Sequence, residues 1–302
     1  MYFDLLAIFL PLLLGYFFKF KNNSPKLNTI NNMTARIIFI ILAIMGLSLA
    51  QISGLEDHLS SMLGLISTFY LALLIFNVLG LLLIERLFPL SAHRTQATPN
   101  LLLLAKESIN LIGVVIVGFL IGKVIAFEKE VVDVASEWTL YLLLFFIGIQ
   151  LRNSGLTLKQ ILVNKQGMVI ALVVIFTSFI AGGIVSIILD INLYHALAIS
   201  SGFGWYSLSG ILISESLGPL LGGASFIIEL LRELTALFLI PLFIQRIPST
   251  SIGYAGATAM DFTLPIIQSQ GGVKCIPVAI VSGFILSLLV PVFMLFFLSI
   301  AP

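Results

Sequence analysis

Residues 256–265, GATAMDFTLP, interrupt an apolar stretch near the end of the chain with an aspartate, Asp261, and several helix breakers. Non-helical backbone at membrane depth is tolerated only where it is buried in protein or lines a wet cavity. The stretch therefore predicts a broken helix with Asp261 at its tip. Pro265 is expected to free the carbonyl of Asp261, four residues back, so that two oxygens could face a cation. The alternative is that Asp261 caps a helix N-terminus near the cytoplasmic surface.

The composition indicates a polytopic membrane protein. Of 302 residues, 59% are hydrophobic and 10% are charged, and the mean hydropathy is +1.15. A soluble domain carries about 25% charged residues. The net charge of +1 gives a nucleic-acid partner no electrostatic basis. One cysteine, Cys275, excludes an intrachain disulfide and a thiolate metal cluster. The first apolar segment has no basic leader and no cleavage site, and is expected to be a retained helix.

Apolar segments of roughly 20 residues predict an all-α fold with about eight transmembrane helices. Two further stretches, 193–216 and 251–268, are interrupted at their centres and are expected to be re-entrant helical hairpins, each entering and leaving on one side. The eight expected spans lie near 2–20, 34–53, 62–84, 108–126, 136–151, 168–189, 222–245 and 276–300, and the short span 136–151 could continue beyond its end.

The basic residues support a layout with both termini outside. Cytoplasmic loops carry an excess of Lys and Arg. With the two hairpins, twelve of the 15 basic residues fall on one side, which is then the cytoplasm; without the hairpins, the alternation fails after residue 190. The twelve are Lys19, Lys21, Lys26, Arg36, Arg86, Arg94, Lys106, Arg152, Lys159, Lys165, Arg246 and Lys274.

A faint internal repeat is present in the first two thirds of the chain. PLLLGYFFKF (11–20) resembles VVIVGFLIGK (114–123), and IILAIMGLSL (40–49) resembles LLLFFIGIQL (142–151), at offsets of 103 and 102 residues. Three spans per unit would make the second unit inverted relative to the first. The alternative is a chance likeness between apolar segments.

The repeats predict two parts of the chain. Residues 1–190 are expected to form a six-span part with two inverted three-helix repeats. Residues 191–302 are expected to form two hairpin-plus-helix units in opposite orientations, which carry the transport site. Inverted repeats are typical of transporters with alternating access.

The first interrupted stretch, AISSGFGWYSLSGILISES (198–216), is rich in small and hydroxyl residues around an aromatic pair. Gly204 releases the helix, and Trp205, Tyr206 and Ser207 follow it. Hydroxyls and freed backbone groups at such a tip could bind a polar ligand. The alternative is a small-residue face for helix packing.

The span 222–245 contains three charges on one face. Glu229, Arg232 and Glu233 fall at i, i+3 and i+4. Ionisable residues in a membrane usually line a pathway or pair with one another. Arg232 is expected to neutralise Glu229, leaving Glu233 as a titratable carboxylate that meets Asp261 at the midplane and takes a cation. The alternative is an ion triad that fixes helix packing.

Several motifs resemble the LysO family of bacterial L-lysine exporters. They are LLLFFIGIQLRNSGLTLKQI, SGFGWYSLSGILISESLGP, LLRELTALFLIP, GATAMDFTLP and GFILSLLVP. The resemblance covers most of the chain and is strongest from about residue 136 onward. It implies an inner-membrane protein that exports lysine, confers resistance to thialysine, and needs two intramembrane acids, which are Glu233 and Asp261 here. Glu229, Trp205 and Tyr206 also match the family in sequence, and Thr263 lies in GATAMDFTLP, but the resemblance implies no role for them.

The expected function is a proton-coupled secondary exporter of L-lysine and thialysine. Its expected partners are L-lysine and its analogues, a coupling ion and the bilayer, with a homodimer left open. A Na⁺-coupled carrier of another small organic solute is the alternative, although only Arg232 offers an intramembrane cation for an anion. No metal-ligand spacing, phosphate loop or nucleophile elbow is found, so neither a cofactor nor an enzyme is expected.

Overall fold

The computed structural model of the chain describes residues 10–11, 13–20, 25–51, 55–87, 89–90, 92, 101–125, 127–153, 164–272 and 274–301. These residues are helical between short connections and include no strand. The helices are α2 (Pro25–Ala50), α3 (Leu55–Leu87), α4 (Leu101–Val124), α5 (Lys129–Arg152), α7 (Lys165–Ile188), α8 (Leu193–Ser200), α9 (Tyr206–Leu217), α10 (Pro219–Phe243), α11 (Pro248–Ala255), the short 3₁₀ helix η1 (Gly256–Met260), α12 (Leu264–Gly271) and α13 (Cys275–Ile300).

The long helices fall on the expected spans, but α2, α3, α4 and α5 each begin seven to nine residues earlier than expected. Helix α5 begins at Lys129, earlier than the expected residue 136, and ends at Arg152. Its first turn contains Glu130, and an acidic side chain there is stabilised by the positive end of the helix dipole. The short span therefore extends at its beginning, and residues 154–163, into which it could continue, lie outside the described residues. Of the first expected span, 2–20, residues 2–9 and 12 lie outside the described residues, and residues 13–16 are helical.

Five described helices are long and apolar enough to cross a membrane, judged by length and composition. They are α2, α3, α5, α7 and α13. Helix α10 has 25 residues, but its central charges keep it out of this set. Large apolar side chains cover the outer faces, such as Phe176 at 65% exposed and Leu242 at 70%. Apolar exposure on this scale is uncommon in a soluble monomer and fits a lipid-facing surface.

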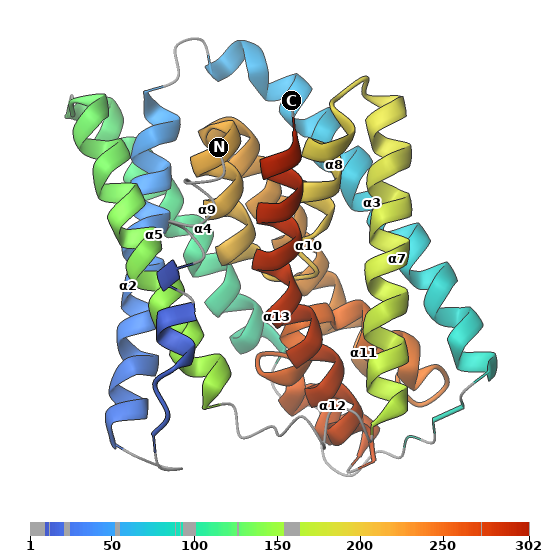
Figure 1. Cartoon of the computed structure of the whole chain (residues 1–302). Coiled ribbons are helices and arrows are strands. Elements are labelled where there is room, and N and C mark those ends of the chain that lie inside the picture. Colours follow the sequence, from blue (N-terminus) through green and yellow to red (C-terminus); the bar gives the residue numbers. More distant parts are fainter. Residues whose placement is uncertain are drawn as a thin grey trace.

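The two predicted interruptions are confirmed as breaks in helices. Helices α8 and α9 are separated by a turn at residues 201–205, where Phe203 and Gly204 have φ angles of 46° and 93°. Helix α11 ends at Ala255, and the chain continues from Gly256, whose φ is 67°, through η1 to α12. Figure 1 shows that α8 and α9 approach from one end of the helix assembly and α11 and α12 from the other.

The tips of the two broken helices, residues 201–205 for the first and 256–261 for the second, meet inside the protein. The backbone N–H of Ala257 donates to the carbonyl of Phe203 at 2.8 Å. The contact requires glycine at residue 256, because a Cβ there would lie 2.0 Å from that same carbonyl oxygen. The second tip also packs on α13 at Gly283, where a Cβ would lie 2.7 Å from the backbone nitrogen of Met260.

Helices in the first part of the chain approach each other through glycines. A Cβ at Gly118 in α4 would lie 2.2 Å from the carbonyl oxygen of Ala43 in α2. A Cβ at Gly15 would lie 2.0 Å from the carbonyl oxygen of Phe145 in α5. Small residues allow this close backbone packing between helices in a membrane.

We expect Gly118→Ala to destabilise the protein by about 1–3 kcal/mol, because the added methyl group meets backbone that cannot move aside. Gly113→Ala in the same helix is the matched control, since a Cβ there meets nothing within 4 Å. Thermal unfolding in detergent measures the difference. Equal unfolding temperatures for the two variants would contradict the close packing of α2 on α4.

Candidate functional site

A cavity of about 280 Å³ lies where the two tips face α2 and α5. Its volume is near the lower end of the roughly 300–1,000 Å³ typical of small-molecule sites. The tips supply the largest share of its lining, and the remainder comes from α2, α5 and α13. Its lining residues are Thr34, Ile38, Leu143, Ile147, Gln150, Trp205, Ser207, Leu208, Ala257, Thr258, Met260, Asp261 and Ser287.

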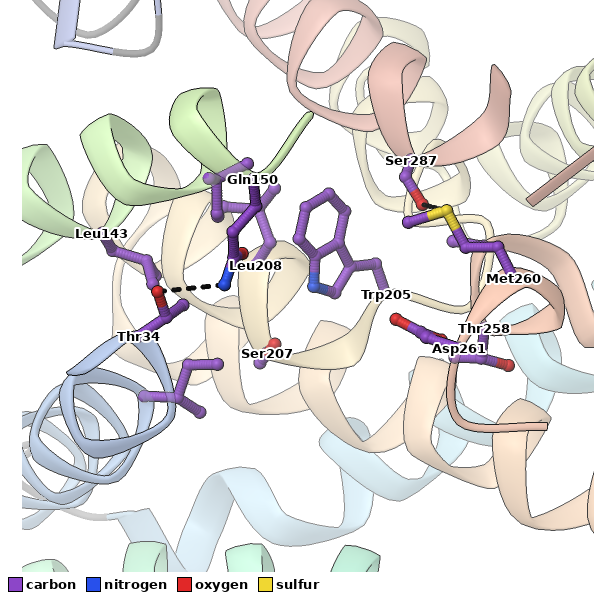
Figure 2. Close-up of a pocket in the computed structure, with 13 residues that line it drawn as sticks. Thr34, Leu143, Gln150, Trp205, Ser207, Leu208, Thr258, Met260, Asp261 and Ser287 are labelled. Carbon is purple, nitrogen blue, oxygen red and sulfur yellow. Dashed lines mark hydrogen bonds between the residues drawn. The ribbon is translucent and has the colours of Figure 1, made fainter. Parts of the chain in front are cut away.

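Polar groups face this cavity from opposite sides. In Figure 2 the Trp205 indole lies between the pair formed by Thr34 and Gln150 and the second tip with Asp261. The Nε2 of Gln150 donates to the Oγ1 of Thr34 at 3.2 Å. Ser207 also lines the cavity, close to the Trp205 ring in Figure 2. The cavity thus combines an aromatic face, several neutral polar groups and one carboxylate.

Asp261 is exposed to the cavity and lies at the end of η1. Its Oδ1 accepts a hydrogen bond from the backbone N–H of Phe262 at 2.5 Å. It does not cap the following helix, because Thr263 occupies that position at the start of α12. The expectation that Pro265 frees the Asp261 carbonyl is wrong. That carbonyl accepts a hydrogen bond from the N–H of Leu264 at 3.2 Å, because the chain forms a turn just before Pro265.

The two charges expected to pair on α10 hold the ends of the two broken helices. The carboxylate of Glu229 accepts a hydrogen bond from the N–H of Gly204, just before α9 begins. The Nε of Arg232 donates to the carbonyl of Tyr254 at 3.1 Å, in the last turn of α11. A negative group at a helix N-terminus and a positive one at a C-terminus both complement the helix dipole.

Glu229 and Arg232 form a loose, fully buried ion pair. The Nη1 of Arg232 lies 4.0 Å from the Oε2 of Glu229, and the two side chains are 2% and 0% exposed. The Arg232 guanidinium also lies over the ring of Tyr254, 5.6 Å from its centroid. The expectation that Arg232 pairs with Glu229 is therefore confirmed.

The other sequence-predicted residues have different surroundings. Glu233 is buried at 1% exposed on α10 and does not line the cavity. It is not a free carboxylate, contrary to expectation, because it too has an interaction partner. Tyr206 packs edge-on against Phe226, with ring centroids 5.7 Å apart, and is not among the residues that line the cavity. Thr263 donates its hydroxyl to the carbonyl of Thr258 at 3.0 Å and stabilises the tip.

Several cavity residues were not predicted as site residues. Thr34, Thr258 and Ser287 supply hydroxyl groups, and Gln150 supplies an amide. A polar residue within an apolar span is a usable signal, and it is clearest for Gln150. The hydroxyl residues give a weaker signal, because they are common in membrane helices as local backbone partners. Thr34 illustrates this use, since its hydroxyl donates to the carbonyl of Ile30 at 2.9 Å.

Glu85 anchors the second broken helix from outside the cavity. Its Oε2 accepts from the backbone N–H of Thr250 at 2.9 Å and from the Thr250 hydroxyl at 3.2 Å. The carboxylate thus caps the first turn of α11 and ties it to the end of α3. Glu85 gives no signal in the sequence, because it lies near the end of a span, where charged residues are ordinary.

Other features offer less chemistry. A second hollow of about 450 Å³ lies between α3, α10 and α11, and its lining is almost entirely apolar. Across the described ranges, no group of three or more His, Cys, Asp or Glu residues is placed to hold a metal ion. The cavity that contains Asp261 is therefore the best candidate for a polar solute.

The chain matches one family model and two curated proteins. The model described as "Lysine exporter LysO" matches residues 112–298. The "Lysine exporter LysO" of Escherichia coli (strain K12) is 46% identical over 299 residues, which cover 98% of this chain and 99% of that protein. A "Putative lysine exporter" of Haemophilus influenzae is 43% identical over 189 residues, covering 63% of this chain and 97% of that protein. No solved structure matches the chain.

We expect either Glu229→Gln or Arg232→Gln alone to destabilise the protein by about 3–5 kcal/mol, because each leaves an uncompensated buried charge. The double variant is expected to cost clearly less than the sum of the two single changes. Unfolding of the four proteins in detergent gives the coupling. Additive effects would show that the two charges act independently.

Proposed function

The chain belongs to the lysine exporter LysO family, and on that premise we propose that it is a secondary exporter of L-lysine in the inner membrane of a bacterium. The observation that carries the proposal is the cavity at the tips of the two broken helices, with Asp261 as its carboxylate. Broken helices that meet within the membrane are a common way to build a substrate site in secondary transporters.

The cavity suits the cationic end of lysine. Asp261 pairs with the ε-ammonium group, and a charge-assisted hydrogen bond of this kind is among the stronger polar contacts. Trp205 offers an aromatic ring to the same cation, which is attracted to the ring face. The neutral groups of Thr34, Gln150 and Ser207 provide further hydrogen bonds to the substrate. Thialysine has the same charges and nearly the same length, so the same site takes it.

Export of a cation needs an energy source. Moving one positive charge outward against an inside-negative potential costs about 2.3 kcal/mol per 100 mV. Inward movement of protons offsets this cost, and Glu233 and Asp261 are the acids we assign to it. Glu233 is buried beside the Glu229–Arg232 pair on α10. A proton that binds to its carboxylate therefore changes the net charge of a buried site.

The arrangement supports alternating access. The two tips approach from opposite ends of the helix assembly, as re-entrant hairpins of opposite orientation would (Figure 1). The glycine contacts of the first part are also reciprocal: Gly15 and Gly118 are equivalent in the internal repeat, as are Ala43 and Phe145. Each glycine meets the carbonyl of the other unit, as expected if two inverted units exchange roles.

A Na⁺-coupled carrier of another organic solute remains the second candidate. In the second tip, the hydroxyl group of Thr258 and the carboxylate of Asp261 offer oxygen ligands that a small cation could use. Transport with and without Na⁺ at constant pH separates this candidate from the proton-coupled exporter.

We expect Asp261→Asn to lower lysine counterflow in proteoliposomes by about tenfold to a hundredfold, since it removes a hydrogen-bonded charge. Glu233→Gln is expected to abolish acceleration of lysine efflux by an imposed pH gradient. Glu130→Gln is the control, because Glu130 is exposed in the first turn of α5. Lysine transport at the wild-type rate in both Asp261→Asn and Glu233→Gln would refute the assignment of these acids.

We propose eight crossings with both termini outside, and cysteine labelling tests this orientation. In a Cys275→Ala background, Lys129→Cys is expected to react with an impermeant thiol reagent on intact cells, because residue 129 lies on the outer side. Arg246→Cys is expected to react only after permeabilisation. The reverse pattern would invert the proposed topology.

A further inference from the structure

We propose that Glu229 and Arg232 form a closed subsite for the head group of the substrate, its α-ammonium and α-carboxylate groups. The inference rests on the proposed function, since it assigns a second half to the same binding site. In it, Glu229 receives the α-ammonium group and Arg232 receives the α-carboxylate, while Asp261 keeps the ε-ammonium group. The pair then acts in recognition as well as in holding the tips.

Three buried polar atoms at this place have no hydrogen-bond partner. They are the Oε1 of Glu229 and the Nη1 and Nη2 of Arg232. Buried donors and acceptors without partners are costly, and charged ones more so. One acceptor beside two donors complements the ammonium and carboxylate groups that every free α-amino acid carries on one carbon. An isolated cation or anion would satisfy only part of this set.

Two of the unpartnered atoms lie against glycines of the two tips. A Cβ at Gly202 would lie 2.6 Å from the Oε1 of Glu229, and a Cβ at Gly256 would lie 3.3 Å from the Nη2 of Arg232. Each tip thus places one glycine against the pair, and the ring of Tyr254 lies against the guanidinium as well. The hydrogen bond from Ala257 to Phe203 closes the two tips over the pair. Parting of the tips opens the pair toward the cavity, which Ala257 already lines.

The distance between the two ends of the site suits lysine. The guanidinium of Arg232, which belongs to α10, lies near Gly256, the first residue of η1. Asp261 follows the last residue of η1. Five residues of 3₁₀ helix span roughly 10 Å. The six bonds from the carboxyl carbon of lysine to its Nζ span roughly 7 Å when extended, a length of the same order as this separation.

The charges balance as well. Glu229, Arg232 and Asp261 together carry one net negative charge, and lysine carries one net positive charge. The occupied site is then neutral, which favours its passage through an apolar surrounding.

Competition with labelled lysine in counterflow tests the proposal on the wild-type protein. Lysinamide lacks the carboxylate, and 6-aminohexanoate lacks the α-ammonium group, while both keep the ε-ammonium group. We expect each to compete about tenfold or more weakly than lysine, because each leaves one buried charge unmatched. Competition by both analogues as strong as that of lysine would overturn the subsite, even if the variants below fail to fold.

The variants are expected to give a crossed pattern. Arg232→Gln should bring lysinamide close to lysine and leave 6-aminohexanoate weak, and Glu229→Gln should do the reverse. The double variant, which keeps the buried charge balanced, should lose both preferences. Ser225→Ala is the matched control, because it removes only a hydroxyl contact with Ser209 on α9 and should keep wild-type ratios.

A purely structural role of the pair would lower transport of all three compounds alike, and unchanged ratios in the variants would therefore reject the proposal. Failure of the proposed function gives a different result. If the wild-type protein shows no lysine counterflow while it binds or moves another solute, lysine export itself is rejected. If lysine moves and the ratios are flat, only the head-group subsite is rejected.

Discussion

One buried ion pair determines how the two broken helices are placed. Glu229 and Arg232 are one turn apart on α10, and each holds the dipole end of opposite sign, the beginning of α9 and the end of α11. Breaking a helix in a membrane exposes backbone groups that lipid cannot satisfy. The pair meets part of that need from a single helix, so that both tips have a common support. The cavity, the position of Asp261 and the contact between the tips all depend on this support.

The same pair explains why charges are tolerated in the middle of α10. Desolvating two charges is costly, and their mutual attraction at 4.0 Å recovers only part of that cost. The remainder comes from the backbone groups of Gly204 and Tyr254, which would otherwise lack partners. The two charged groups thus lie 4.0 Å from each other but form hydrogen bonds with the backbone of the tips. A loose pair is also easier to divide when the tips move apart.

Most of the fold could be predicted from local patterns, because hydropathy and helix breakers act within a short window. The breaks near Gly204 and Gly256 and the pairing of Glu229 with Arg232 follow from spacing alone. The hydrogen bond that the Asp261 carbonyl accepts could not be predicted, because it depends on the turn formed by the next three residues. The position of Thr34 near the tips could not be predicted either, because it depends on how helices distant in the sequence pack together.

The position of Trp205 gives the protein an internal optical probe. The chain has only two tryptophans, and the other, Trp138, is 67% exposed on the outer face of α5. The indole of Trp205 lies in the cavity between the two groups of polar residues (Figure 2). The fluorescence emission of an indole depends on the polarity around the ring. Once Trp138 is replaced by phenylalanine, the emission of Trp205 therefore reports occupancy of the cavity and hydration of the tips.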